Sequence, residues 1–333
     1  MVKNYLIISL RNILRNKLFT FINIFGLSIG IATSILIYLY VIHELSYDKN
    51  QPKYERIYRI VSNTPHENKV ESEAITPNPF IPALRNEMTQ LEAMTRIIYL
   101  EEGVAMVNNQ KYKMNNLMYI EPQFFDLFSV EWLVGSPSVF QGPDVAVLSE
   151  STAKKLFGSI DVLNKPLNIN GKNSFTVRGV IKDNELTNIP FNILLAYEGY
   201  SKLDMPFSID DWGVKISGFQ SFVTLRDRSE LGNVEKLINE ISNKNTPDKS
   251  SKSVYSLQPL AKIRTDVVYG NSNLNGYTNP IYLISSAMVG FFILFLGCVN
   301  YINLTLSMLI KRNKEIGIRK VNGAVSKNIN ESE

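Results

Sequence analysis

The sequence predicts a membrane protein in which two transmembrane α-helices flank an extracytoplasmic α+β domain. Two runs predict the helices, because residues 18–42 and 267–310 contain no Asp, Glu, Lys, Arg or His. A helix needs about 20 consecutive apolar residues to cross the hydrocarbon core of a bilayer, and both runs are longer than that. The expected segments along the chain are 1–17, 18–42, 43–280, 281–310 and 311–333.

Positively charged residues are concentrated at the two ends of the chain. Residues 1–17 contain four Lys or Arg and no acidic residue, and residues 311–333 contain six Lys or Arg and three Glu. Lys and Arg mark the cytoplasmic side of membrane segments, so both termini are expected in the cytoplasm and residues 43–280 outside it. The net charge of +4 is therefore interpreted as a topology signal and not as the signature of a nucleic-acid partner.

The first apolar run is expected to remain in the mature protein as a membrane helix. It is about twice as long as the core of a signal peptide, and no small-residue cleavage site follows it. Ahead of it, Leu6, Leu10 and Leu14 share one side of a helix that carries basic residues elsewhere. This pattern fits a cytoplasmic amphipathic helix over 1–17, although a plain positive flank explains the same residues. Because the single cysteine, Cys298, lies in the second run, the outer domain is expected to fold without disulfides.

Small and polar residues mark one face of each predicted membrane helix. In the first helix they recur every four residues, which lets the backbone of another helix approach closely. In the second helix they fall within about 120° of the circumference, and an amide is costly against lipid, so this face is expected to meet protein. Interhelical packing explains this second face better than a polar transport path does. The helix-packing residues are Gly26, Gly30 and Ser34 in the first helix, and Gly297, Asn300, Asn303 and Ser307 in the second.

The domain over 43–280 shows local signals of both helices and strands. The stretch AVLSESTAKKLFG predicts a strand and then a short helix, with Ser149 as its N-cap and Gly158 as its stop. The dipeptide Asn170-Gly171 predicts a tight hairpin turn, and Gly179 marks a bulge or a close approach in the strand that follows. Strands, helix and hairpin in series indicate an α+β domain.

Three further segments of the domain are assigned from composition. Residues 56–61 are expected to form a strand, and the polar, proline-bearing stretch 62–79 is expected to be a loop. The stretch NKNTPDKSSKS at 243–253 is the best candidate for an exposed linker.

Motifs that carry enzyme chemistry are missing from the sequence. It contains no G-x-x-x-x-G-K-[ST] phosphate loop, and neither His43 nor His66 has a metal-ligand partner at useful spacing. No G-x-S-x-G elbow supports a nucleophilic serine. We therefore expect no catalytic residue, no metal and no cofactor.

Several stretches, in order, resemble MacB-type, FtsX-like permeases of ABC transporters. SLRNILRNKLFTFINIFGLSIGIA is similar to their amphipathic entry and first membrane helix, and FFDLF, VLSESTAKKLFG and FTVRGVIKD to their periplasmic core domain. CVNYINL and KRNKEIGIRKVNGA are similar to the end of their second helix and its cytoplasmic continuation. The resemblance implies a multi-pass protein of the bacterial inner membrane. It also implies a cytoplasmic ABC ATPase subunit, a second permease copy and membrane lipids as partners.

In the resembled family, this cytoplasmic continuation contacts the separate ATPase. Glycines at 317 and 323 would break or cap a helix, and the basic side chains offer contacts to carboxylates or phosphates. An ordinary positive flank would require only Lys and Arg, whereas this segment also carries a Glu-Ile-Gly pattern. The residues that match the family's coupling motif are Glu315, Gly317, Arg319, Lys320 and Gly323.

The function implied by the resemblance is a non-ATPase permease subunit that couples a cytoplasmic ATPase to an extracytoplasmic domain, for export or for mechanical signalling. The alternative is a membrane-anchored extracytoplasmic ligand sensor, which shares the topology but would need a signalling coiled coil or kinase after the second helix. Family members continue with further membrane helices, so the chain is expected to be a truncated copy.

Overall fold

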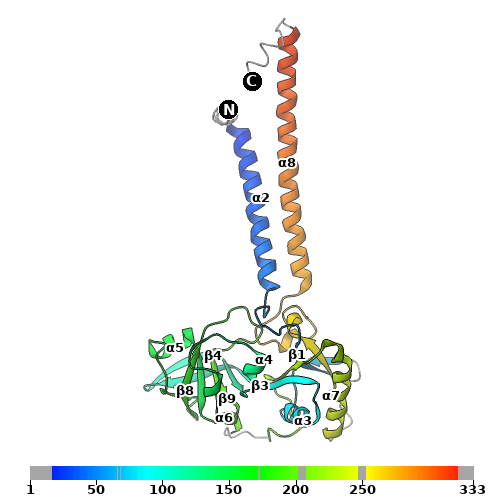
Figure 1. Cartoon of the computed structure of the whole chain (residues 1–333). Helices are drawn as coiled ribbons and strands as arrows, with labels where there is room; N and C mark the ends of the chain where they lie inside the picture. The colour runs from blue at the N-terminus through cyan, green and yellow to red at the C-terminus, as the bar shows by residue number, and fades with distance from the viewer. Residues whose placement is uncertain are drawn as a thin grey trace. The chain divides into compact units, whose positions relative to one another are not determined.

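The structure of the chain is a computed structural model that describes residues 17–65, 67, 69–171, 173–201, 208–246 and 253–321. The chain forms two compact units, of which one contains the long helices and the other spans Glu44–Pro280 (Figure 1). The helices are α2 (Lys17–Glu44) and α8 (Pro280–Val321). Of the amphipathic helix predicted over 1–17, only Lys17 lies within the described residues, and it begins α2.

The first lobe of the domain is an antiparallel sheet with the strand order β11–β1–β10–β3. Its elements follow in the chain as strand, helix, strand, strand, helix and strand, which is the ferredoxin-like βαββαβ arrangement. These elements are β1 (Ile57–Pro65), α3 (Phe80–Glu87), β3 (Leu91–Val107), β10 (Phe219–Leu225), α7 (Leu231–Asn245) and β11 (Val254–Pro259).

Helices α3 and α7 cover one face of this sheet with apolar side chains. In α7, Val234, Ile238 and Ile241 recur at helical spacing and are buried. They pack with Phe80 and Leu84 of α3 in one core cluster above the strands. Burial of this apolar stripe, which the sequence carries at i, i+4 and i+7, drives the two helices onto the sheet.

The second lobe is inserted between β3 and β10 and closes into a ring of strands. Pairings run from β3 to β4, β9, β6, β8 and β7, and β7 pairs with β3 again. A closed ring leaves no unpaired sheet edge. The elements of this lobe are β4 (Gln110–Ile120), α4 (Phe124–Leu127), β5 (Trp132–Val134), β6 (Val145–Ser149), α5 (Glu150–Phe157), β7 (Pro166–Ile169), β8 (Asn173–Ile181), β9 (Ile193–Ala196) and α6 (Tyr197–Ser201).

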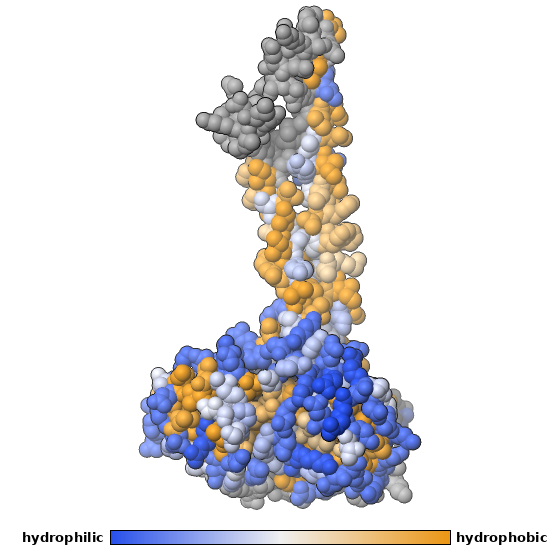
Figure 2. Space-filling model, viewed as in Figure 1, coloured by the Kyte–Doolittle hydropathy of each residue, from blue (hydrophilic) through white to orange (hydrophobic). Residues whose placement is uncertain are grey.

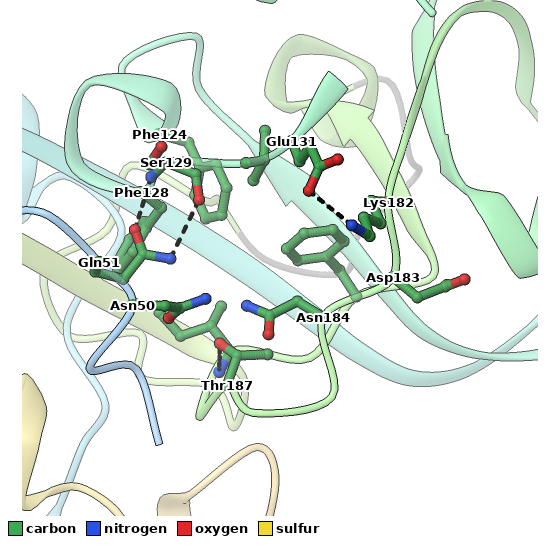
Figure 3. A pocket seen from close by; sticks show the side chains of 13 residues that line it. Asn50, Gln51, Phe124, Phe128, Ser129, Glu131, Lys182, Asp183, Asn184 and Thr187 are labelled. Atoms are coloured by element: carbon green, nitrogen blue, oxygen red, sulfur yellow. Dashed lines mark hydrogen bonds and ion pairs between the residues drawn. The ribbon is translucent and has the colours of Figure 1, made fainter. Parts of the chain in front are cut away.

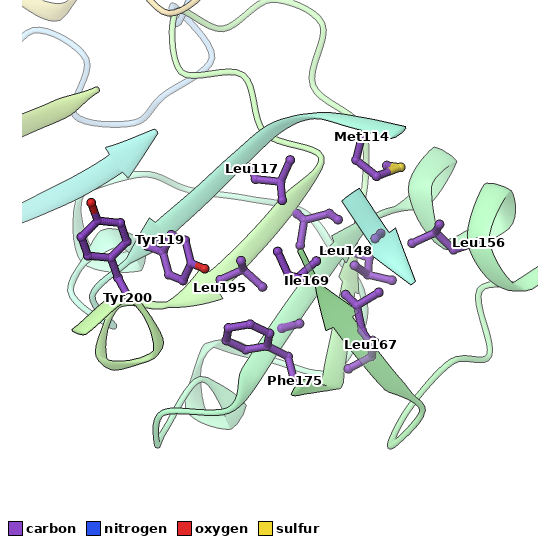
Figure 4. Packing of buried hydrophobic residues seen from close by; sticks show 14 of the residues in the cluster. Met114, Leu117, Tyr119, Leu148, Leu156, Leu167, Ile169, Phe175, Leu195 and Tyr200 are labelled. Atoms are coloured by element: carbon purple, nitrogen blue, oxygen red, sulfur yellow. The ribbon is translucent and has the colours of Figure 1, made fainter. Parts of the chain in front are cut away.

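The interior of this ring is filled by apolar side chains from its strands (Figure 4). Leu117 of β4, Leu148 of β6 and Leu195 of β9 are fully buried there. Leu167 and Phe175 lie opposite each other in the β7–β8 hairpin and belong to the same cluster. The ring is therefore a packed core without room for a channel.

Four short 3-10 helices and a small edge strand complete the described part of the chain. The edge strand β2 pairs with β1. The bounds of these elements are β2 (Val70–Glu73), η1 (Pro137–Val139), η2 (Arg228–Glu230), η3 (Leu260–Lys262) and η4 (Gly270–Ser272).

The local signals read in the second lobe are confirmed. The hydroxyl of Ser149 accepts a hydrogen bond from the Thr152 amide at the start of α5, and Gly158 ends that helix with a φ of 74°. Asn170 and Gly171 have φ angles of 55° and 70° in the β7–β8 turn. A Cβ at Gly179 would lie 2.6 Å from the Trp132 ring, so the close approach requires glycine there.

One assignment made from composition is wrong, and a second is wrong over its first three residues. The predicted loop over 62–79 contains the end of β1 and all of β2, because an edge strand is held by backbone hydrogen bonds and its exposed side chains can be polar. The predicted linker over 243–253 begins inside α7, whose buried stripe keeps the helix intact as far as Asn245. Residues 247–252 of that linker lie outside the described part of the chain.

Candidate functional site

The two long helices carry apolar side chains along most of their lengths. Helices α2 and α8 include segments, Ile24–Glu44 and Pro280–Ser307, that are long and apolar enough to cross a membrane. Figure 2 shows these apolar residues gathered along both helices. Large hydrophobic side chains that point away from protein, such as Leu36 and Phe291, are 67% and 64% exposed. An exposed surface of this kind is normal against lipid and unusual against water.

Helix α2 meets α8 through the small residues of its predicted packing face. A Cβ at Gly30 would lie 3.6 Å from the carbonyl oxygen of Ile293, so the two backbones approach closely there. The hydroxyl of Ser34 lies within hydrogen-bond distance of two carbonyl oxygens, that of Gly30 at 2.8 Å and that of Gly290 at 2.9 Å. Ser34 therefore links the two helices directly.

The predicted face of α8 is divided between contacts to α2 and contacts within its own helix. The Asn300 side-chain nitrogen would lie 3.6 Å from a Cβ at Gly26, and Gly297 lies opposite the Leu27 side chain. Asn303 and Ser307 are exposed, and the Ser307 hydroxyl donates to the Asn303 carbonyl at 2.9 Å.

Gly290 belongs to the contact between the helices but was not predicted from the sequence. A Cβ at this position would lie 3.3 Å from the Ile37 side chain, and its carbonyl faces Ser34. Its position seven residues before Gly297 is the signal that could have identified it, because residues seven apart share a helix face.

The predicted coupling segment continues α8 without a break as far as Val321, the last described residue. The sequence predicted that Gly317 would break or cap a helix, which is wrong, because α8 runs through it to Val321. An interior glycine weakens a helix by about 1 kcal/mol but does not end it when both flanks favour helix. The side chains of Glu315, Arg319 and Lys320 lie outside the described structure, as does the whole of Gly323.

A buried ion pair joins the end of α2 to the segment that leads into α8. Arg264 contacts the Glu44 carboxylate through two nitrogens, at 2.8 and 3.2 Å. The same carboxylate accepts a hydrogen bond of 2.6 Å from the Thr278 hydroxyl, and the Arg264 guanidinium lies 4.2 Å from the centre of the Tyr47 ring. We call Glu44, Arg264 and Thr278 the clamp. Its partners are about 220 residues apart, so no local sequence signal reveals it.

A second buried carboxylate, Asp48, holds the chain after α2 against the second lobe. It accepts hydrogen bonds from the backbone amide and the side-chain amide of Asn188, at 3.0 and 2.7 Å. Burial raises the pKa of Asp48 above its usual value, and the hydrogen bonds from Asn188 and Thr187 oppose part of that rise. From the other side, the Asn275 side-chain amide donates to the Thr187 carbonyl at 2.8 Å. The chain leaving α2 and the chain approaching α8 are thus fixed to one loop.

A small pocket of about 170 Å³ lies beside this loop (Figure 3). Phe124, Phe128 and Phe191 form its apolar wall, and the Asn50 and Asn184 amides stand at its polar side. Ligand sites usually enclose about 300–1,000 Å³, so this pocket is small for an organic substrate. Among the described residues, no group of three or more His, Cys, Asp or Glu side chains is arranged to hold a metal ion.

Comparison with known proteins establishes the family of the chain. The family model for the MacB-like periplasmic core domain matches residues 20–241. The chain belongs to this family. The match begins inside α2 and ends inside α7, so the MacB-like region includes Glu44 of the clamp, whereas Arg264 and Thr278 follow it.

Two curated relatives are named as macrolide export proteins. The macrolide export ATP-binding/permease protein MacB of Aggregatibacter actinomycetemcomitans is 28% identical over 235 residues, which are 68% of this chain and 33% of the relative. The protein with the same description from Mannheimia succiniciproducens is 25% identical over 234 residues, with the same shares. The chain thus spans 33% of the length of each of these relatives.

A solved structure shares the fold of the MacB-like domain. It is a domain of a protein from Porphyromonas gingivalis that is assigned as a permease. It is 23% identical, has a TM-score of 0.55, and the match covers 64% of this chain and 92% of that domain. This likeness supports the fold assignment alone.

Proposed function

We propose that the chain is a permease subunit of an ABC transporter, which couples an ATPase to a domain on the other side of the membrane. The match to the MacB-like family over 20–241 carries this proposal, because the curated relatives are ATP-binding/permease proteins. The 333 residues contain no phosphate-binding loop, so ATP hydrolysis would belong to a part outside them. The chain itself would have no catalytic role.

The membrane placement in this proposal follows from charge. Lys and Arg at both ends of the chain favour cytoplasmic termini, with α2 and α8 crossing a bacterial inner membrane and the domain outside. The exposed apolar surfaces of the two helices agree with this placement. A second copy of the chain and membrane lipids are further proposed partners.

Contacts within each of the two units suggest how motion would pass along the chain. Gly30 and Ser34 hold α2 against α8, so that the helices would move as a pair. The clamp fixes the chain at Glu44 to the chain at Thr278, which are the two points where the domain meets the helices. An ATPase-driven displacement that reaches Glu44 would therefore also move Thr278, because the clamp joins these two residues within the domain.

Copurification with an ABC ATPase tests the proposal. The tagged full-length chain is expected to retain an ATPase encoded beside its gene. Arg319→Glu should abolish this binding, because it reverses the charge at the expected contact, where a buried charged contact is worth about 2–5 kcal/mol. Gly317→Pro should also uncouple, since proline breaks a helix interior at a cost of about 3 kcal/mol.

Lys236→Glu is the matched control for the charge reversal. Lys236 is an exposed lysine of α7 in the domain, so its reversal should leave ATPase binding unchanged. All variants should still reach the membrane, because the remaining basic residues preserve the topology signal. If Arg319→Glu and Gly317→Pro both bind like the wild type, the segment is only a positive flank.

A further inference from the structure

The uncharged run over 267–310 begins well before helix α8, the helix that it predicts. It starts at Val267, whereas α8 starts at Pro280, so 267–279 belong to the domain and still contain no charged residue. A membrane-spanning helix does not explain this part of the run. The segment contains six Asn, Ser or Thr residues, so it is the absence of charge and the exposed apolar residues among them that need another explanation.

The segment is held in a fixed shape by hydrogen bonds. The Asp266 carboxylate accepts from the Val268 amide at 3.0 Å. The Asn273 side chain donates to the Ile263 carbonyl at 2.7 Å and accepts from the buried Arg59 guanidinium at 2.6 Å. A Cβ at Gly270 would lie 2.5 Å from the Tyr277 ring, so this ring packs directly on the turn.

Two asparagines of this segment point inward and three large apolar side chains are exposed, although Leu274 packs against a core cluster and Asn271 is exposed. The side-chain amides of Asn273 and Asn275 form hydrogen bonds to other groups of the domain. Val267, Val268 and Tyr277 point outward and are 47%, 57% and 44% exposed. Three exposed large apolar side chains within eleven uncharged residues are unusual for a surface in contact with water.

Two exposed apolar residues of the domain lie close in sequence to the ends of the helices. Tyr277 lies three residues before Pro280, and the neighbouring Thr278 donates to Glu44, the last residue of α2. Leu45, the next residue, is also 44% exposed. Leu45 follows Glu44 in the chain, Tyr277 precedes Thr278, and Val267 and Val268 lie three and four residues after Arg264 of the clamp. We call these four exposed residues the collar.

We propose that the collar lies in the interfacial layer of the bilayer and binds lipid. Valine and leucine side chains would enter the boundary between headgroups and acyl chains, and a tyrosine there places its ring in the apolar layer and its hydroxyl near the headgroups. The collar would fix the height of the domain above the membrane. This inference rests on the proposed membrane placement of α8.

Lipid-contact fluorescence on the full-length chain tests the proposal. In a Cys298→Ala background, Val268→Cys is labelled with the environment-sensitive dye NBD and reconstituted into phosphatidylcholine/phosphatidylglycerol vesicles. A share of the lipid carries a spin label near the headgroup. The matched control is Val254→Cys, because Val254 is 56% exposed and begins β11, at the opposite end of that strand from the collar segment.

The spin-labelled lipid should lower the emission at position 268 by about half or more, since a side chain at the headgroup boundary touches lipid, and should leave position 254 unchanged. Val267→Cys repeats the measurement if the first variant does not fold. Equal emission loss at positions 268 and 254 would overturn the proposal. Protection of position 268 from aqueous iodide without quenching by lipid would assign the collar to a protein contact and would also overturn it.

Quenching of a label on the native Cys298 distinguishes a failure of the collar proposal from a failure of the proposed membrane placement. Labelled in the unmodified chain, Cys298 of α8 should be quenched by lipid that is spin-labelled in mid-chain. Quenching at Cys298 without quenching at 268 would refute only the collar. Absence of quenching at Cys298 would refute the membrane placement and the collar with it.

Discussion

Breaking the clamp should destabilise the domain far more than breaking a surface ion pair. Arg264→Met would leave the Glu44 carboxylate buried with the Thr278 hydroxyl as its remaining clamp partner. The paired side chains are only 14% and 8% exposed, and loss of one member of a buried pair costs about 3–5 kcal/mol. For a domain of this size, 1 kcal/mol corresponds to about 2–4 °C, so the melting temperature should fall by roughly 6–20 °C.

The melting temperature can be measured on the full chain in detergent. The sequence has two tryptophans, Trp132 and Trp212, and both lie in the domain, so intrinsic fluorescence reports its unfolding. The control is Lys113→Met, which removes the ion pair between the exposed Lys113 and Glu102 side chains and should cost about 0.2–1 kcal/mol. The reasoning is refuted if Arg264→Met lowers the melting temperature no more than Lys113→Met does.

Three further predictions concern the clamp, the helix pair and pH. Thr278→Val should lower the free energy of unfolding by about 1.5–3 kcal/mol in the same assay, because it removes a hydrogen bond to a charged group. A melting temperature equal to that of the wild type would contradict this prediction. Gly30→Leu should speed amide hydrogen exchange in α2 and α8, whereas Gly30→Ala, whose Cβ would meet Ile293 at 3.6 Å, should not; equal exchange in both would count against the helix contact. Burial raises the folded-state pKa of Asp48, so the folded state retains a proton that the unfolded chain releases, and stability falls as the pH rises from about 4 through that raised pKa. In urea unfolding, Asp48→Asn should make the free energy of unfolding less dependent on pH, by up to about 1.4 kcal/mol per pH unit. An unchanged pH dependence would show that Asp48 does not cause it.

Local features of the fold could be predicted from the sequence because a few neighbouring residues determine them. Ser149 caps α5 and Gly158 ends it through hydrogen bonds and backbone angles within one turn of helix. Asn170 and Gly171 likewise adopt the positive φ angles that a tight hairpin requires. The edge strand β2 was missed because its side chains show no apolar alternation.

Features that depend on long-range contacts could not be predicted. The pairing of β3 with β10 joins segments more than 110 residues apart, since the whole second lobe is inserted between them. The clamp likewise joins Glu44 to Arg264 across 220 positions. The small residues of α2 indicated a helix contact, but only the structure identified α8 as the partner and Gly290 as a participant.

Side-specific labelling tests the central claim most directly, namely that the helices separate the domain from the coupling segment. In a Cys298→Ala background, Val70→Cys places a thiol on an exposed site of the domain, and Gly317→Cys places one on an exposed site of α8 beyond its apolar part. A membrane-impermeant maleimide added to spheroplasts should label position 70 at once and position 317 only after lysis. Equal labelling of both positions before lysis would contradict the account.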